Sequence, residues 1–159
     1  SLRRQRQMCI RDRIIADCPR DLRVLLYRRF MLRIAERIAL REGALAVVTG
    51  EALGQVASQT LENLAALQAC ISLPVLRPLI GFDKKEIIDL ARSLGTYEIR
   101  ATARDDCCSY LVPPHPATKA EPKELEEAEA PLAVNELVEA ALEGCERILM
   151  EGLLPGERP

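Results

Sequence analysis

"ALAVVTG", residues 44–50, is a short apolar run with two adjacent valines and a glycine at its end. A run of this kind predicts a buried strand of a parallel sheet. Before it, residues 22–41 carry apolar side chains at helical spacing, with Asp21 suited to the N-cap and Gly43 to the C-terminal stop. A helix followed by a buried strand indicates an α/β fold.

The pattern then repeats along the chain. It predicts two helices, over residues 59–70 and 84–94, and two strands, over residues 74–80 and 96–101. Ser58 is suited to cap the first of these helices, and Asp83 with Glu86 has the spacing of a capping box for the second. Alternating helices and strands predict a parallel sheet with right-handed crossovers, flanked by helices.

The composition indicates an aliphatic core and no membrane span. Hydrophobic residues make up 48% of the 159 residues, but aromatic residues only 3%, and there is no Trp. The longest uncharged run, residues 63–76, has 14 residues and contains Pro74, whereas a span needs about 20. Six cysteines at irregular spacings favour free thiols in a reducing compartment, so we expect a cytoplasmic protein.

Basic and acidic residues are unevenly distributed along the chain. Residues 1–41 hold 12 of the 22 basic residues, and residues 121–151 hold ten Glu. The basic end could face an anion, although solvated helix faces give the same pattern. Apolar positions at helical spacing after residue 133 predict an amphipathic C-terminal helix.

We expect three segments. "MCIRDR", residues 8–13, reads as a translated sequencing adapter, so residues 1–13 are expected to be non-native read-through. Residues 14–120 would form the α/β domain, and residues 121–159 an acidic helix and tail.

Two adjacent thiols, Cys107 and Cys108, lie in "RDDCCSY", residues 104–110. Four interpretations are open: a metal site, a redox pair, a sulfur-handling nucleophile, or two buried apolar residues. A metal site is disfavoured, because the sequence has no CxxC motif and His115 is its one histidine. A proline-rich polar loop is also a poor place to bury two cysteines.

The segment after the first predicted strand, "TGEALGQVASQTLENL" (residues 49–64), can bind a ligand. It starts at the carboxyl end of a strand, where open α/β sheets bind ligands. Gly50 and Gly54 allow the backbone to approach a ligand, and Gln55, Ser58 and Gln59 can hydrogen-bond a base or a ribose. An ordinary loop followed by a helix cap is the alternative.

Four blocks in this order carry a resemblance to a known family. They are "YRRFMLRIAERIA" (27–39), "VTGEALGQVASQTLENL" (48–64), "LPVLRPLIGFDKKEII" (73–88) and "DDCCSYLVPPHPATK" (105–119). Together they resemble the C-terminal half of the PP-loop ATPase domain of the tRNA 4-thiouridine synthase (tRNA sulfurtransferase, ThiI) family, which is also linked to thiamine thiazole synthesis. The resemblance implies part of a Rossmann-like sheet of the adenine nucleotide alpha hydrolase type.

The resemblance also implies a reaction and its residues. In this family ATP, with Mg²⁺, adenylates O4 of a uridine in tRNA, and persulfide sulfur then displaces AMP at C4. Arg28, Gly50 and Gln59 match positions that contact ATP in the family. Lys84 matches a functionally important lysine, and Cys107 matches the cysteine that takes part in sulfur transfer.

The sequence also departs from the family pattern. It has no SGGxDS-type loop for the pyrophosphate of ATP, no ferredoxin-like and THUMP region for tRNA, and no rhodanese domain. We therefore expect a fragment that neither binds ATP tightly nor thiolates tRNA alone. It would need an external persulfide donor such as a cysteine desulfurase or a rhodanese, and an exposed sheet edge would favour a homodimer.

Two alternatives to this function stay open at the level of sequence. One is another PP-loop ligase, such as a different tRNA thiolase or an amidotransferase-type synthetase. The other is a stand-alone thiol-redox or metal-binding α/β module.

Overall fold

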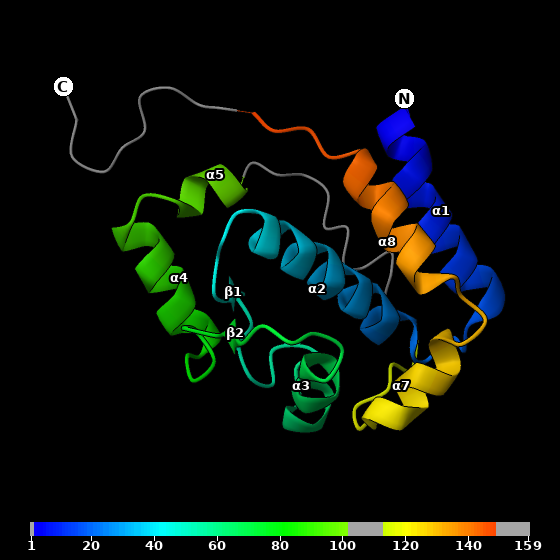
Figure 1. The fold of residues 1–159 in the computed structure, drawn as a ribbon. Helices are drawn as coiled ribbons and strands as arrows, with labels where there is room; N and C mark the ends of the chain where they lie inside the picture. The colour runs from blue at the N-terminus through cyan, green and yellow to red at the C-terminus, as the bar shows by residue number, and fades with distance from the viewer. Residues whose placement is uncertain (1, 102–112, 149–159) are drawn as a thin grey trace.

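The computed structural model describes residues 2–101 and 113–148 (Figure 1). In chain order the elements are α1 (Leu2–Asp17), α2 (Arg23–Arg41), β1 (Val47–Val48), α3 (Leu61–Gln68), β2 (Val75–Leu76), α4 (Lys84–Ser93), α5 (Tyr97–Ala101), α7 (Pro122–Glu129) and α8 (Val134–Glu143). β1 and β2 pair in parallel, with Val47 opposite Val75. Helices flank this small parallel sheet, so the predicted α/β class is confirmed.

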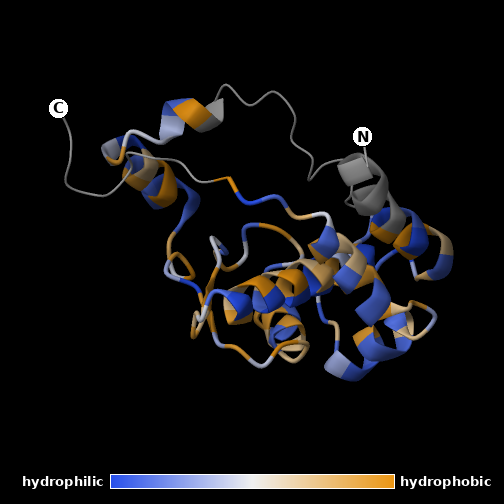
Figure 2. Ribbon diagram, turned by 45° about the horizontal axis from the view of Figure 1, so that its top comes forward, coloured by the Kyte–Doolittle hydropathy of each residue, from blue (hydrophilic) through white to orange (hydrophobic). Residues whose placement is uncertain are grey.

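Helix α2 lies at the centre and contacts α1, α3, α7, α8 and β1 (Figure 1). Apolar and polar residues alternate along it, as Figure 2 shows, and its buried residues lie in the first half of the helix, up to Leu32. Leu25, Leu26 and Phe30 of α2 are almost completely buried, together with Leu67 of α3 and Leu125 of α7. Burying each such side chain contributes about 1.5–3 kcal/mol, which explains how a mostly aliphatic core holds five helices together.

The two ends of the chain join the same core. Ile14 of α1 is fully buried and Ile10 packs against the cluster. At the other end Val138 and Leu142 of α8 are buried, which confirms the predicted amphipathic C-terminal helix. Helix α7 precedes α8 and was not among the predicted elements, because the pattern in "PKELEEAE" has only one large apolar residue.

Both strands are shorter than predicted, and the first is not buried. The predicted strands over residues 44–50 and 74–80 contribute only two residues each. Val75 is buried, but Val48 is 66% and Leu76 54% exposed. Val48 and Leu76 are paired, so both side chains lie on one face of the sheet, and on that face they are largely exposed.

Three further local predictions were wrong. Residues 96–101, predicted as a strand, contain helix α5. The N-cap of α2 is Leu22 with no side-chain cap, so Asp21 does not cap it. Helix α3 is capped by Thr60, whose hydroxyl accepts from the Asn63 amide, rather than by Ser58. Each correction moves a boundary by one or two residues or replaces a short strand by a single helical turn, where local patterns are least decisive.

The stops and the capping box are as predicted. Gly43 and Gly95 have φ of 70°, the left-handed conformation that glycine adopts without strain at a helix C-terminus. Asp83 accepts from the Glu86 amide, and the Glu86 carboxylate accepts from the Asp83 amide. The start of α4 is therefore fixed by its own sequence.

Candidate functional site

The loops that follow β1 and β2 meet at the carboxyl ends of the two strands, which form one edge of the sheet. Because the two strands are parallel, their carboxyl ends point the same way. The Leu53 amide in the first loop donates to the Ile80 carbonyl in the second at 3.0 Å. This is the position at which open α/β sheets bind ligands.

A charged cluster, here called the strand-end triad, lies at this edge and consists of Arg28, Glu51 and Arg77. Glu51 Oε1 pairs with Arg28 Nη2, and Glu51 Oε2 accepts from Arg77 Nε at 2.5 Å. The Thr49 hydroxyl also donates to Oε2, at 3.0 Å. The three side chains are 15%, 11% and 16% exposed, so two guanidinium groups share one largely buried carboxylate.

The triad carries a surplus of positive charge. Burial first, and then the neighbouring charge of Arg77, lower the pKa of Arg28 to about 10. Burial also lowers the pKa of Arg77. One carboxylate balances only one of the two cations, so an anion at this edge would be stabilised.

Arg28 also holds the first loop in place. Its Nη1 donates to the Ser58 carbonyl at 2.6 Å, which ties α2 to the end of the loop after β1. Gln59 comes next, and its backbone is engaged: its amide donates to Val56 at 2.9 Å and its carbonyl accepts from Gly54 at 3.0 Å.

Two buried polar atoms at this edge have no partner within the described residues. They are Gln59 Oε1, an acceptor, and Arg77 Nη2, a donor. A buried polar group without a hydrogen bond costs about 1–3 kcal/mol. A ligand with a donor for Gln59 and an acceptor for Arg77 would satisfy both.

The structure brings three of the five predicted residues to this edge. Arg28 and Gln59 lie at the loop after β1, and Gly50 begins that loop. Gly50 is exposed, and an added Cβ would meet no atom within 4 Å. Packing within the chain therefore does not require glycine here, and the space beside its backbone is open.

The other two predicted site residues are Lys84 and Cys107. Lys84 is the exposed first residue of α4, and no hydrogen bond or ion pair is found for it within the described residues. Cys107 and its neighbour Cys108 lie outside the described residues. The grouping of Lys84 and Cys107 with the strand-end triad stays a prediction.

Thr49, Glu51 and Arg77 belong to the site but were not among the predicted residues. Glu51 and Arg77 each follow a strand within three residues, and polar residues at that place are a usable signal. The pairing of Arg77 with Glu51, however, joins residues 26 positions apart and is visible only in the fold.

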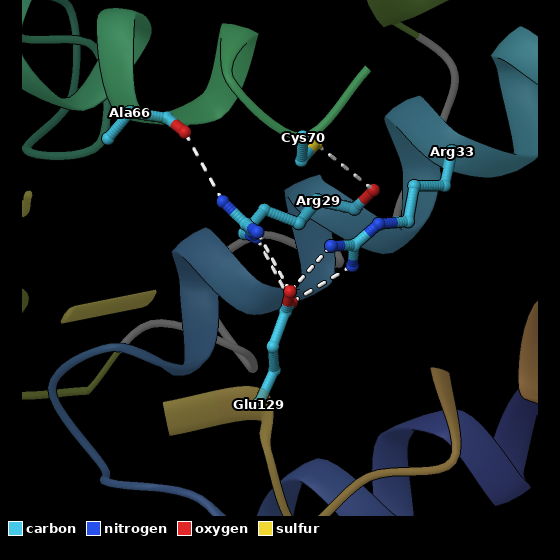
Figure 3. A network of polar contacts seen from close by, with 5 residues as sticks. All are labelled: Arg29, Arg33, Ala66, Cys70 and Glu129. Carbon is cyan, nitrogen blue, oxygen red and sulfur yellow. Dashed lines mark hydrogen bonds and ion pairs between the residues drawn. The ribbon is translucent and has the colours of Figure 1, made fainter. Parts of the chain in front are cut away.

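A second cluster has the same composition but a different place. This helix triad consists of Arg29, Glu129 and Arg33 and links α2 to α7 (Figure 3). Arg29 Nη2 and Nε bind the two carboxylate oxygens at 2.8 and 3.0 Å, and Arg29 Nη1 donates to the Ala66 carbonyl at 3.3 Å. Arg33 donates to both oxygens as well, at 2.5 and 2.9 Å. Its polar atoms have partners, so the helix triad serves packing.

The remaining described thiols do not form a site. Cys18 is buried and Cys70 half-buried, and burial raises the pKa of both. Cys145 is exposed. Among residues 2–101 and 113–148 there is no group of three His, Cys, Asp or Glu side chains that could hold a metal ion. The same part of the chain has no helix long and apolar enough to cross a bilayer.

Comparison with known proteins gives a consistent result. The model of the family described as "Thiamine biosynthesis protein (ThiI)" matches residues 6–134. The probable tRNA sulfurtransferases of Moorella thermoacetica and Thermus thermophilus are both 49% identical, over 89% and 93% of this chain. The matched segment is 36% of each relative, so the chain spans about a third of their length.

A solved structure agrees with the sequence relatives. It is a crystal structure of a 4-thiouridine synthetase–RNA complex with bound ATP, 43% identical and superposed with a TM-score of 0.75 over 84% of this chain and 34% of the other. The family model covers well over half of the chain, and the fold agrees with that match. The chain therefore belongs to the ThiI family.

Proposed function

We propose that this chain supplies part of the ATP site, and the sulfur-handling thiol, of a tRNA sulfurtransferase that makes 4-thiouridine. The observation that carries the proposal is the strand-end triad, which places surplus positive charge at the carboxyl ends of two parallel strands, with one buried donor, Arg77 Nη2, that has no acceptor among the described residues. The relatives' names and the ATP-bound RNA complex support the substrate classes.

The residues at the strand ends suit ATP. Arg28 provides a guanidinium for phosphate, Gly50 an open backbone, and Gln59 an amide oxygen that lacks a donor. We expect Mg²⁺ to accompany ATP, held by the phosphates together with one or two carboxylates. Lys84, at the exposed start of α4, would add a second cation for the anion.

The proposed reaction has two steps. Uridine O4 attacks the α-phosphorus of ATP and pyrophosphate leaves, which converts O4 into a good leaving group. The terminal sulfur of the donor persulfide then attacks C4 and AMP leaves, which joins C4 to the donor cysteine through an S–S bond. The Cys107 thiolate attacks the donor sulfur of this bond, so that 4-thiouridine is released and Cys107 forms a disulfide with the donor cysteine. Cys107 takes part in that transfer.

We place the reaction in the cytoplasm, with tRNA bound mainly by parts of the protein other than this segment. A cysteine desulfurase or a rhodanese would supply the persulfide, and the protein would act as a homodimer. A contribution to thiamine thiazole synthesis is proposed on the family description alone.

A chimeric enzyme tests the proposal. The matching segment of the Thermus thermophilus relative is replaced by this chain, and 4-thiouridine is measured in tRNA by nucleoside analysis with ATP and a persulfide donor. We expect 4-thiouridine from the chimera, none from its Cys107→Ser variant, and full activity from Cys145→Ser, which removes an exposed thiol elsewhere.

Two outcomes would contradict the proposal. One is a folded chimera that forms no 4-thiouridine. The other is a Cys107→Ser chimera that forms it at the unmodified rate. The Cys145→Ser control separates a specific loss from general sensitivity to thiol removal.

A further inference from the structure

Arg77 has no role in the predictions above, yet it lies at the centre of the strand-end site. We propose that Arg77 is a second phosphate-binding arginine of the nucleotide site, held beside Arg28 by the Glu51 carboxylate. The inference rests on the proposed function, since it names the part of ATP that Arg77 contacts.

The geometry places Arg77 where a ligand would arrive. It is the first residue after β2, and its Nη1 turns back to the Val75 carbonyl at 3.3 Å. Nε donates to Glu51, and Nη2 is a buried donor with no acceptor in the part of the chain that the structure describes. A phosphate oxygen would supply the missing acceptor; Nη2 itself is buried, and the 16% of the Arg77 side chain that is exposed belongs to its other atoms.

The helix triad serves as a comparison, because its two arginines have a packing role. There, too, two arginines share one glutamate, but Arg29 and Arg33 direct their donors to Glu129 and to a backbone carbonyl (Figure 3). In the strand-end triad one donor has no partner among residues 2–101 and 113–148. The difference therefore lies in the unused donor and in the position at the strand ends, not in composition.

Charge favours a phosphate over the neutral parts of ATP. The strand-end triad combines two cations with one anion, so within the described residues one positive charge of this largely buried cluster has no counter-charge in the triad. The Thr49 hydroxyl donates to Glu51 and strengthens the carboxylate's hold on both arginines. An anionic group beside Arg77 would balance the remaining charge, whereas adenosine would not.

The isolated 159-residue chain can test this, because weak binding is measurable by NMR. The amide spectrum of ¹⁵N-labelled chain is titrated to millimolar concentrations with ATP, with inorganic tripolyphosphate and with adenosine. In the wild-type chain, ATP and tripolyphosphate should shift amides in residues 49–60 and 77–83. In Arg77→Met the Kd for both should rise about tenfold, as expected for loss of a hydrogen bond between charged groups, with adenosine binding unchanged.

Two variants serve as controls. Arg33→Met removes one arginine from the helix triad, and should leave all three affinities unchanged. Arg77→Lys keeps the charge but loses the planar fork, so its loss should be smaller, about threefold. If Arg77→Met proves unfolded by its spectrum, Arg77→Lys decides the matter by the same comparison of tripolyphosphate with adenosine.

The inference is overturned if ATP binds Arg77→Met as tightly as the wild-type chain, if adenosine binding weakens as much as ATP binding, or if ATP shifts no amide at the strand ends. A selective loss of binding to a single-stranded oligoribonucleotide, with ATP unaffected, would assign Arg77 to RNA phosphate and also contradict it. These results are independent of the chimera assay: an unchanged ATP affinity leaves the proposed function standing, whereas a chimera without 4-thiouridine contradicts that function itself.

Discussion

Glu129 is the residue on which the packing of α7 against α2 depends most. Its carboxylate accepts four hydrogen bonds from Arg29 and Arg33, all within 3.0 Å. Burial opposes its ionisation, but the hydrogen bonds from Arg33 and Arg29 outweigh burial and hold the pKa of Glu129 below its usual value. The charged form is thus part of the folded state.

Replacing Glu129 by Gln should destabilise the fold by about 3 kcal/mol, because two arginines lose their shared anion in a buried place. Urea unfolding at neutral pH measures this, with Glu126→Gln on the exposed side of α7 as the control. A loss no larger than that of the control would mean that the helix triad does not hold α7.

Acid should weaken the same contact. A carboxyl group whose pKa is depressed on folding contributes stability that is complete above its unfolded pKa, about 4.3 for Glu, and is lost as pH falls through the folded value. Glu36, which accepts from the Ser72 and Leu73 amides, also has a lowered pKa, despite partial burial. The free energy of unfolding should therefore fall below about pH 4.3, and less steeply in Glu129→Gln than in the wild-type chain.

At the scale of elements, α4 is held mainly by its own ends. No side chain of α4 is buried, and its principal neighbour is α5. Its capping box and the glycine after its C-cap are local features. This helix is therefore expected to open independently of the core, which would move Lys84 with it.

Asp83→Ala tests the dependence of α4 on its cap. Losing the N-cap costs about 1 kcal/mol, so hydrogen exchange of the α4 amides should speed up about fivefold while exchange in α2 stays unchanged. Asp89→Ala, an exposed change inside the same helix, is the control. Equal exchange rates in Asp83→Ala and the control would show that other contacts hold α4.

The sequence could predict the features that depend on neighbouring residues, and not those that depend on distant partners. Helix α2, the capping box at Asp83 and the stops at Gly43 and Gly95 depend on neighbouring residues, and all were predicted correctly. The lengths of β1 and β2 depend on pairing partners and on cover for both faces, which a local pattern does not contain. Residues 96–101 are too short a segment for their pattern to distinguish a strand from one helical turn.

The site residues also divide into those that the sequence could supply and those whose pairing is visible only in the fold. The family resemblance supplied Arg28, Gly50 and Gln59, and the fold brings them to one edge of the sheet. The positions of Glu51 and Arg77 just after a strand were a usable signal, but their ion pair was not recognisable, because its two residues are 26 positions apart in the sequence. Long-range ion pairs leave no periodic trace in a sequence.

At the scale of the whole molecule, the core around α2 and the strand-end site share one helix. Along α2, Arg29 and Arg33 fix the helix triad, while Arg28 reaches the loop after β1. Leu25, Leu26 and Phe30 anchor the same helix in the core. The position of Arg28 at the proposed ATP site is therefore set by the packing of the entire chain.

The proposed function assigns Lys84 and Cys107 to different chemical steps. In the chimera, Lys84→Ala should reduce pyrophosphate release and 4-thiouridine formation together, because it weakens the ATP step. Cys107→Ser should leave pyrophosphate release intact, because adenylation precedes sulfur transfer.

The most direct test is therefore the ratio of 4-thiouridine formed to pyrophosphate released, measured in a single turnover of the chimera with tRNA, ATP and a persulfide donor. We predict a ratio near that of the unmodified chimera for Lys84→Ala, with both amounts reduced, and a ratio near zero for Cys107→Ser. Loss of pyrophosphate release in Cys107→Ser, or a ratio in Cys107→Ser equal to that of the unmodified chimera, would contradict the assignment of Cys107 to the sulfur-transfer step.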